Sequence, residues 1–140
     1  PPPSLPVRAQ PRRALKVASV SETTILHNPA CSTSRAALEN AEDVGAAVEV
    51  RNYLKQPLTE AELRDLIAIL RDPVGDLVRR DAYFVEQGLE HDDIDDADSV
   101  VATLLAHPRL LQRPILVRDG VAIIGRPKDR AKAFLAGQDV

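Results

Sequence analysis

The sequence predicts an α/β fold in which a small mixed β-sheet is covered by helices. Two short β-rich runs, over residues 23–26 and 47–53, flank a segment of helical periodicity. This pattern is typical of parallel strands joined by a right-handed crossover. Two later apolar runs, over residues 115–117 and 121–124, flank an Asp-Gly pair that favours a hairpin turn. The chain has 140 residues, of which 44% are hydrophobic and 28% are charged, so it fits one soluble domain.

The residues before Thr23 differ from the rest of the chain in composition. Proline and arginine are frequent there, and the segment has neither helical nor strand periodicity. We therefore predict that residues 1–22 form a disordered extension. Their proline density disfavours the amphipathic helix of a transit peptide. The folded domain is expected to span residues 23–137.

The first helix is expected directly after a turn over residues 27–31. Apolar residues then recur at helical spacing between Ala36 and Val44. Three hydroxyl residues that favour helix N-caps stand at its start, and these are Ser32, Thr33 and Ser34.

The middle of the chain is predicted to be a helical insertion. Thr59, with Glu62 three residues later, has the pattern of a capping box, which begins a helix that ends near Pro73. Residues 74–80 are expected to form a short helix with two adjacent arginines. The acidic stretch over residues 90–98 lacks the glycine and the terminal glutamate of a calcium-binding EF-hand. We expect a solvated loop there, and no bound metal.

Two more helices complete the predicted fold. The first follows the acidic stretch, with Asp98 as its N-cap. Its predicted buried face consists of Val100, Val101, Leu104 and Leu105. The last helix begins at Pro127, because proline suits the first turn of a helix. Its inward residues are expected to be Ala131, Phe134 and Leu135.

Composition excludes several classes of function. A net charge of -3 and the presence of only two Tyr and two Phe argue against a nucleic-acid partner. No apolar run approaches the roughly 20 residues that cross a bilayer, so no membrane partner is expected. The single cysteine, Cys31, cannot form an intramolecular disulfide or a multi-cysteine zinc site. It indicates a reducing compartment, and we expect a cytoplasmic protein.

Cys31 stands immediately before a predicted helix, where free amides and the helix dipole favour the thiolate. His27 and Arg35 are close enough in sequence to add to this effect. The alternative is a buried structural cysteine, for which the polar flanking residues are poorly suited. A cysteine-phosphatase loop requires an arginine where this chain has Ala37, and a C-x-x-C redox pair requires a cysteine where it has Ser34.

Four segments of the chain carry a linked set of motifs. They are HNPACSTSR at residues 27–35, LVRR at 77–80, HPRLLQRP at 107–114 and GRP at 125–127. In this order and spacing they resemble the glutaredoxin-linked arsenate reductase (ArsC) family, over about residues 24–136. The resemblance implies a thioredoxin-like fold with a helical insertion, in which Pro114 matches the cis-proline of such folds.

The resemblance also implies the reduction of arsenate to arsenite through a covalent Cys31–S–As intermediate. Cys31 would be the nucleophile, and three arginines would bind the oxyanion. Those arginines are Arg79, Arg113 and Arg126. Arginine suits this task because its rigid, permanently charged fork matches oxyanion geometry. His27 and Ser34 would tune the thiolate, and Asn28 would shape the loop.

Reduction of As(V) to As(III) oxidises two thiols to a disulfide, whereas this chain has one cysteine. An external thiol must therefore act. The resemblance implies glutathione with glutaredoxin, or an equivalent such as mycothiol with its redoxin, and no bound cofactor. The protein is expected to be a monomer.

Three other functions are open to a chain of this kind. One is an Spx-like transcriptional regulator, although redox sensing in that group usually requires the C-x-x-C motif that is absent here. Another is a related thiol reductase-like protein of unknown substrate, a group that keeps the cysteine without the full set of arginines. The third is a module that only binds an anion.

Overall fold

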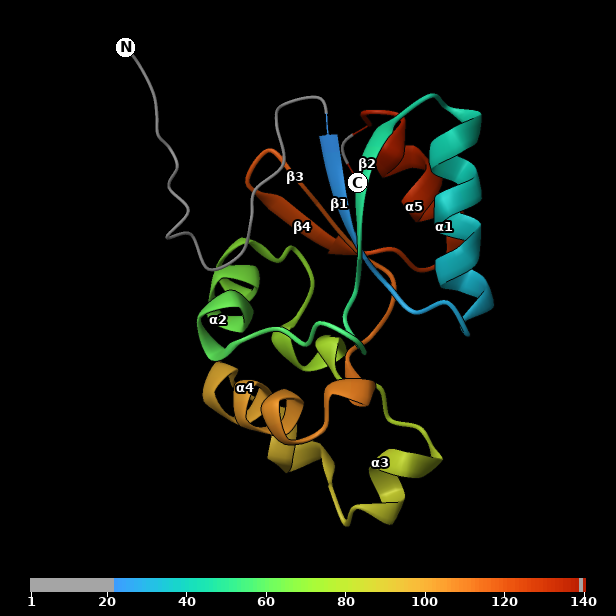
Figure 1. Ribbon diagram of the computed structural model, residues 1–140. Helices are drawn as coiled ribbons and strands as arrows, with labels where there is room; N and C mark the ends of the chain where they lie inside the picture. Colours follow the sequence, from blue (N-terminus) through green and yellow to red (C-terminus); the bar gives the residue numbers. More distant parts are fainter. Residues whose placement is uncertain (1–21, 139) are drawn as a thin grey trace.

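Four strands form one mixed sheet in the computed structural model, which describes residues 22–138 and 140. The strand order is β2-β1-β3-β4 (Figure 1). The strands are β1 (Glu22–His27), β2 (Ala47–Asn52), β3 (Ile115–Arg118) and β4 (Val121–Ile124). β1 pairs in parallel with β2 and antiparallel with β3, and β3 pairs antiparallel with β4. The predicted mixed sheet is therefore confirmed. The predicted extension lies outside the described residues except for Glu22, which begins β1.

Five α-helices and three short 3-10 helices are present in the described part of the chain. The α-helices are α1 (Ser32–Asp43), α2 (Glu60–Ile69), α3 (Ala82–Glu86), α4 (Ala97–Ala106) and α5 (Lys128–Leu135). The 3-10 helices are η2 (Val74–Leu77), η3 (His91–Ile94) and η4 (Pro108–Leu110). All elements from α2 to η4 lie between β2 and β3 in the sequence, so the predicted helical insertion is also confirmed.

The sheet separates two hydrophobic cores because successive strand residues point to opposite faces. Ile25 and Leu116 pack with residues of α1 and α5. Their neighbours Leu26 and Ile115 pack instead with α2, α4 and the rest of the insertion. Figure 1 shows α1 and α5 together on one side of the sheet and the insertion away from them. The result is a three-layer arrangement with the sheet in the middle.

The structure corrects the prediction of a helix over residues 74–80. Only Val74–Leu77 is helical, and the two arginines that follow lie outside it. Arg79 N donates to Leu110 O at 2.7 Å, and Gln112 N donates to Leu77 O at 2.7 Å. These bonds form a short antiparallel bridge between Val78 and Leu111. Pairing with a distant segment has replaced the local helical bonds, and it places Arg79 beside the segment that leads to β3.

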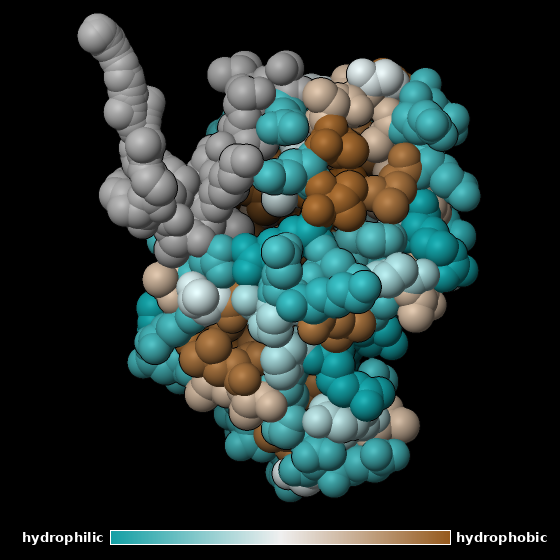
Figure 2. Space-filling model, viewed as in Figure 1, coloured by the Kyte–Doolittle hydropathy of each residue, from teal (hydrophilic) through white to brown (hydrophobic). Residues whose placement is uncertain are grey.

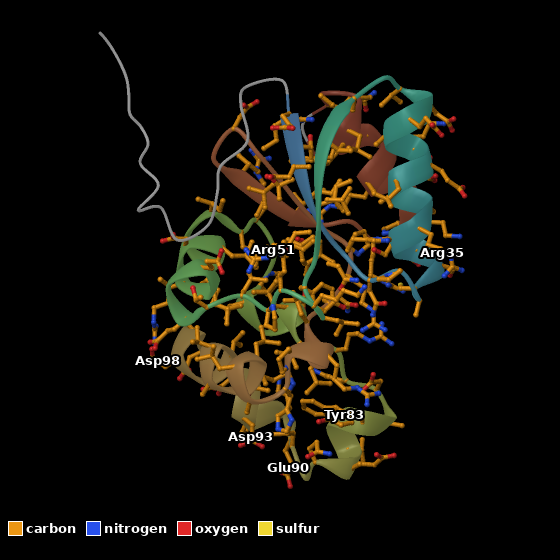
Figure 3. All side chains as sticks on the ribbon, viewed as in Figure 1. Arg35, Arg51, Tyr83, Glu90, Asp93 and Asp98 are labelled. Carbon is orange, nitrogen blue, oxygen red and sulfur yellow. The ribbon has the colours of Figure 1, made fainter. Side chains whose placement is uncertain are left out.

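The acidic stretch is also more ordered than predicted. It contains η3 and the start of α4, and a capping box joins Glu90 and Asp93 (labelled in Figure 3). The N-cap of α4 is Asp96, which accepts a bond from Ser99 N at 2.8 Å, rather than Asp98. Asp98 lies in the first turn, where it pairs with Arg64. Within residues 22–138 and 140, no cluster of three or more His, Cys, Asp or Glu side chains is arranged to hold a metal ion.

The visible surface is mainly hydrophilic, with a few separate apolar patches (Figure 2). The large apolar side chains that are exposed are Val50, Leu54, Val85 and Leu105. Scattered apolar side chains of this kind are common on protein surfaces. Among the described residues, every helix is too short or too polar to span a membrane.

A partly buried ion pair ties the insertion to the sheet. Arg51 lies at the end of β2 (Figure 3), and both terminal nitrogens of its guanidinium contact the Glu62 carboxylate, at 2.5 and 3.0 Å. The same carboxylate accepts a bond from Thr59 N, while Thr59 Oγ1 accepts one from Glu62 N, so the predicted capping box is confirmed. Burial raises the pKa of Glu62, but Arg51 and the bonds from Thr59 hold it below its usual range.

We expect Glu62→Ala to lower the free energy of unfolding by about 2 kcal/mol, because it removes the capping box and leaves Arg51 without its carboxylate. Urea denaturation measures this change. The pKa of Glu62 is depressed in the folded protein, so its stabilisation is present above the unfolded pKa and is lost as the pH falls through the folded pKa. The deficit of the variant should therefore shrink in acid. Glu60→Ala, at an exposed ion pair with Arg64, is the control, and equal losses in both variants would contradict the assignment.

Candidate active site

Cys31 occupies the N-cap position of α1, between the end of β1 and the first helical turn. Its amide donates to Asn28 O at 3.0 Å, and its carbonyl accepts from Arg35 N at 2.9 Å. The thiol is free and partly exposed. None of the three hydroxyl residues predicted to cap the helix does so, because the cysteine itself takes that position. The amides at the second and third helical positions, those of Thr33 and Ser34, lower the pKa of its thiol.

Two of the predicted arginines approach the sulfur from the open end of the β3–β4 hairpin, Arg113 before β3 and Arg126 after β4. Arg126 Nη1 lies 3.9 Å from Cys31 Sγ and donates to Arg113 O at 3.0 Å. Each arginine precedes a proline with a cis peptide bond, including the expected one at Pro114. Gly125 N donates to Pro114 O at 2.8 Å, which holds the two ends together. A Cβ atom on Gly125 would collide with the side chain of Leu116, so glycine is required there.

The environment of Cys31 favours the thiolate despite partial burial. Burial by itself raises the pKa of the thiol. The amide of Ser34, the Arg113 guanidinium, the amide of Thr33 and the Arg126 guanidinium together lower it to about 7. At neutral pH about half of the thiol is therefore ionised, and the thiolate is the nucleophilic form.

The third predicted arginine, Arg79, lies on the segment beside Arg113 but makes no hydrogen bond to the sulfur. Its Nε is 3.5 Å from Asp81 Oδ2, a carboxylate that also caps α3 through Phe84 N. The Nε atoms of Arg79 and Arg113 are both buried and have no hydrogen-bond partner within the described part of the chain. The structure thus brings Arg113 and Arg126 to the thiol, with Arg79 on the neighbouring segment.

His27 and Ser34 contact each other. His27 Nδ1 is 2.6 Å from Ser34 Oγ, which also accepts a bond from Asn28 N at 3.1 Å. Burial and the positive charge of Arg35 lower the pKa of His27, so its ring is neutral at pH 7 and can accept the Ser34 proton. No hydrogen bond joins His27 to Cys31 among residues 22–138. Ser34 acts on the thiol through its amide, and a direct role for His27 stays a prediction.

Arg35 supports the loop rather than the sulfur. Its Nη1 donates to Pro29 O at 2.8 Å. Figure 3 shows its side chain on α1, near the start of that helix. The sequence predicts that Arg35 adds to the stabilisation of the thiolate. The structure shows a different contact, in which its guanidinium holds the turn that precedes Cys31.

Asn28 bonds within the loop, which it is expected to shape. It also contacts Tyr53, a residue that the sequence motifs do not indicate. Asn28 Oδ1 accepts from Ala30 N at 2.9 Å, and Asn28 Nδ2 donates to Tyr53 Oη at 3.3 Å. Tyr53, which is only 1% exposed, donates in turn to Leu111 O at 3.3 Å. The position of Tyr53 in the sequence is consistent with this contact, because Tyr53 follows β2, which is parallel to β1. The carboxyl ends of such neighbours lie at the same edge of a sheet.

We expect the rate of alkylation of Cys31 by iodoacetamide to rise with pH with a midpoint near 7. Only the thiolate reacts, so the rate increases as the pH rises through the pKa. Arg126→Ala removes a cation beside the sulfur, and it should shift the midpoint upward and slow the reaction severalfold at pH 6.5. Arg64→Ala, on the exposed face of α2, is the control. A wild-type midpoint near the ordinary value of about 8.5 would contradict the assigned environment.

The chain is similar to known proteins in sequence and in fold. The sequence profile of the ArsC family matches residues 26–134. An arsenate reductase of Neisseria meningitidis is 39% identical over 116 residues, which cover 81% of this chain and 98% of that protein. An arsenate reductase of Escherichia coli K12 is 38% identical over 111 residues, or 79% of this chain and 78% of that protein. The structure of an arsenate reductase from Vibrio cholerae superposes with a TM-score of 0.71 at 32% identity, covering 81% of this chain and 97% of that one.

Proposed function

This chain belongs to the ArsC family, and on that premise we propose that it reduces arsenate to arsenite. One observation carries the proposal. A thiol with a pKa of about 7 lies against the guanidinium of Arg126, and the buried Nε–H group of Arg113 has no hydrogen-bond partner in the described residues. The buried Nε–H of Arg79 likewise makes no hydrogen bond there, although it lies 3.5 Å from the Asp81 carboxylate. Buried donors without acceptors are rare in folded proteins. The oxygens of a tetrahedral oxyanion are acceptors of the kind that such donors bind.

Arsenate and a thiolate are both negative, so cations must offset their repulsion before a bond can form. The chain as a whole has a net charge of -3, and it therefore has to concentrate positive charge locally. Arg113 and Arg126 provide that charge at the sulfur, and we assign Arg79, on the neighbouring segment, to the outer oxygens of the anion. The arginine forks suit both the anion and the arsenic-bearing intermediate.

In the proposed first step, the Cys31 thiolate attacks arsenic. A sulfur–arsenic bond forms, one arsenic–oxygen bond breaks, and the oxygen leaves as water after protonation from solvent. Arsenic remains As(V) in this adduct. A second thiol, from outside the chain, then replaces another oxygen and forms a second sulfur–arsenic bond with the release of a second water.

In the proposed second stage, a thiol of a redoxin attacks the sulfur of the external thiol. A disulfide forms, and the electron pair of the broken sulfur–arsenic bond passes to arsenic, which becomes As(III). Water then hydrolyses the remaining bond and regenerates Cys31. In total, one arsenate and two thiols give one arsenite, one disulfide and one water. We propose glutathione and glutaredoxin, or an equivalent pair such as mycothiol and its redoxin, as the two donors.

Cys31→Ser should abolish arsenate reduction, because serine at neutral pH is not ionised and cannot form the sulfur–arsenic bond. The reaction is measured as arsenite formed in the presence of glutathione, glutaredoxin and their reducing system. Circular dichroism and the unfolding midpoint should match those of the wild type. Substantial turnover by a correctly folded variant would contradict the covalent mechanism.

Arg113→Ala should lower kcat/KM for arsenate by roughly 100-fold, because it removes a preorganised cation from the oxyanion. Arg118→Ala is the matched control, at the far end of the strand that follows Arg113. Arg118 lies at the other end of β3, where its guanidinium stacks on the Phe134 ring at 4.3 Å and contacts Asp119. We expect the control to change kcat/KM by less than about threefold. Equal losses in the two folded variants would contradict the role of Arg113.

A further inference from the structure

A polar cleft with a volume of about 340 Å³ adjoins the thiol site. Its size falls within the range of roughly 300 to 1,000 Å³ that is usual for small-molecule sites. The polar residues that line it are Asp72, Asp76, Arg80, Gln112, Arg126 and Arg130. Arg126 belongs to both sites, because its Nη1 also lies 3.9 Å from Cys31 Sγ. The cleft and the thiol site are therefore neighbours that share the Arg126 side chain.

Two of the charged lining residues form a fixed wall. Arg130 Nη1 is 2.7 Å from Asp72 Oδ1 and also donates to Ile124 O at 3.1 Å. Asp72 Oδ2 accepts from Ile124 N at 2.9 Å. These bonds clamp the end of β4 and neutralise both charges within the protein. Neither residue has a free charge to offer a ligand.

Of the three remaining charged side chains, Arg126 also contacts Cys31, whereas Asp76 and Arg80 are exposed and uncommitted. Neither makes an ion pair with any residue in the described ranges. The one hydrogen bond of the Arg80 side chain there is a long one, from Nη2 to Gly75 O at 3.4 Å. A Cβ atom on Gly75 would lie 2.8 Å from Ile94 O and 3.5 Å from Arg80 Nη2, so glycine keeps this part of the lining close-packed. Besides the shared Arg126, the cleft thus presents one free negative and one free positive charge.

This mixed charge selects among possible ligands. An inorganic oxyanion would be repelled by Asp76, and a purely apolar thiol would leave both charges unpaired. A small peptide thiol that carries an ammonium group and carboxylates offers a partner to each of them. Such a thiol must also come close to arsenic on Cys31, because the chain has no second cysteine.

We propose that this cleft binds the peptide thiol that resolves the arsenic adduct, with Asp76 contacting its ammonium group and Arg80 one of its carboxylates. The role of the bound thiol as a reactant rests on the proposed arsenate reduction, whereas binding of the thiol does not. The cleft itself can be tested by binding alone. Its residues Asp76 and Arg80 lie outside the set that holds the oxyanion, so the two sites can be perturbed separately.

Steady-state kinetics with glutathione provide the first test. Arg80→Gln and Asp76→Asn should each raise KM for glutathione by roughly fivefold to tenfold, as expected for the loss of one charge-assisted contact. KM for arsenate, and kcat at saturating glutathione, should stay within twofold of the wild type. Arg64→Gln is the control for the loss of an exposed arginine. An unchanged KM for glutathione in both cleft variants would overturn the proposal.

Direct binding provides the second test and does not depend on turnover. The full chain carrying Cys31→Ser is titrated with reduced glutathione by calorimetry, with and without Arg80→Gln or Asp76→Asn. Binding that weakens in both double variants supports the cleft even if the wild type fails to reduce arsenate. No binding, or binding that neither substitution weakens, overturns the proposal. Sulfate is the comparison ligand. If sulfate displaces glutathione in an Arg80-dependent manner while Asp76→Asn has no effect, the cleft is a simple anion site. That result would also overturn the proposal.

Discussion

The active site depends on holding a cysteine thiolate at the start of α1 while part of its surface is buried. Burial alone would keep the thiol protonated, and three structural elements offset it. The first turn of α1 provides two amides, and the two ends of the β3–β4 hairpin provide Arg113 and Arg126. The two arginines lie 82 and 95 residues after Cys31 in the sequence, so the charge state of one sulfur depends on the sheet being correctly assembled.

The insertion is part of the site as well as a cover for the sheet. The pair between Arg51 and Glu62 fastens its first helix to the end of β2. The bridge between Val78 and Leu111 then carries Arg79 alongside the segment that ends at Arg113. One hydroxyl group, that of Tyr53, links the loop before Cys31 to the same segment through Leu111 O. The insertion is therefore in direct contact with the segment that carries Arg113.

Two neighbouring regions with different charge patterns share Arg126. At the sulfur, the charged side chains that act on the thiol are cationic, which suits a multiply charged oxyanion. In the adjoining cleft, the free charges besides the shared Arg126 are one acid and one base, on Asp76 and Arg80, which suits a zwitterion. In the proposed reaction, this separation gives each of the two reactants a distinct place beside Cys31. The local pattern matters more than the net charge of the chain, which is weakly negative.

The sequence by itself determined the order of the main elements, because helical and strand periodicities, the Asp-Gly turn and the Thr59–Glu62 capping box are local patterns. Its linked motifs also indicated the family of the chain, and with it Cys31 and the arginines as candidate site residues. It could not show that residues 78–80 leave the helix, that Asp96 rather than Asp98 caps α4, or that Tyr53 supports the loop. Each of these outcomes is decided by partners that lie far away in the sequence or by competition between adjacent caps. The lowered pKa of the thiol and the free charges of the cleft likewise depend on tertiary contacts. These contacts decide which guanidinium groups are paired and which are not.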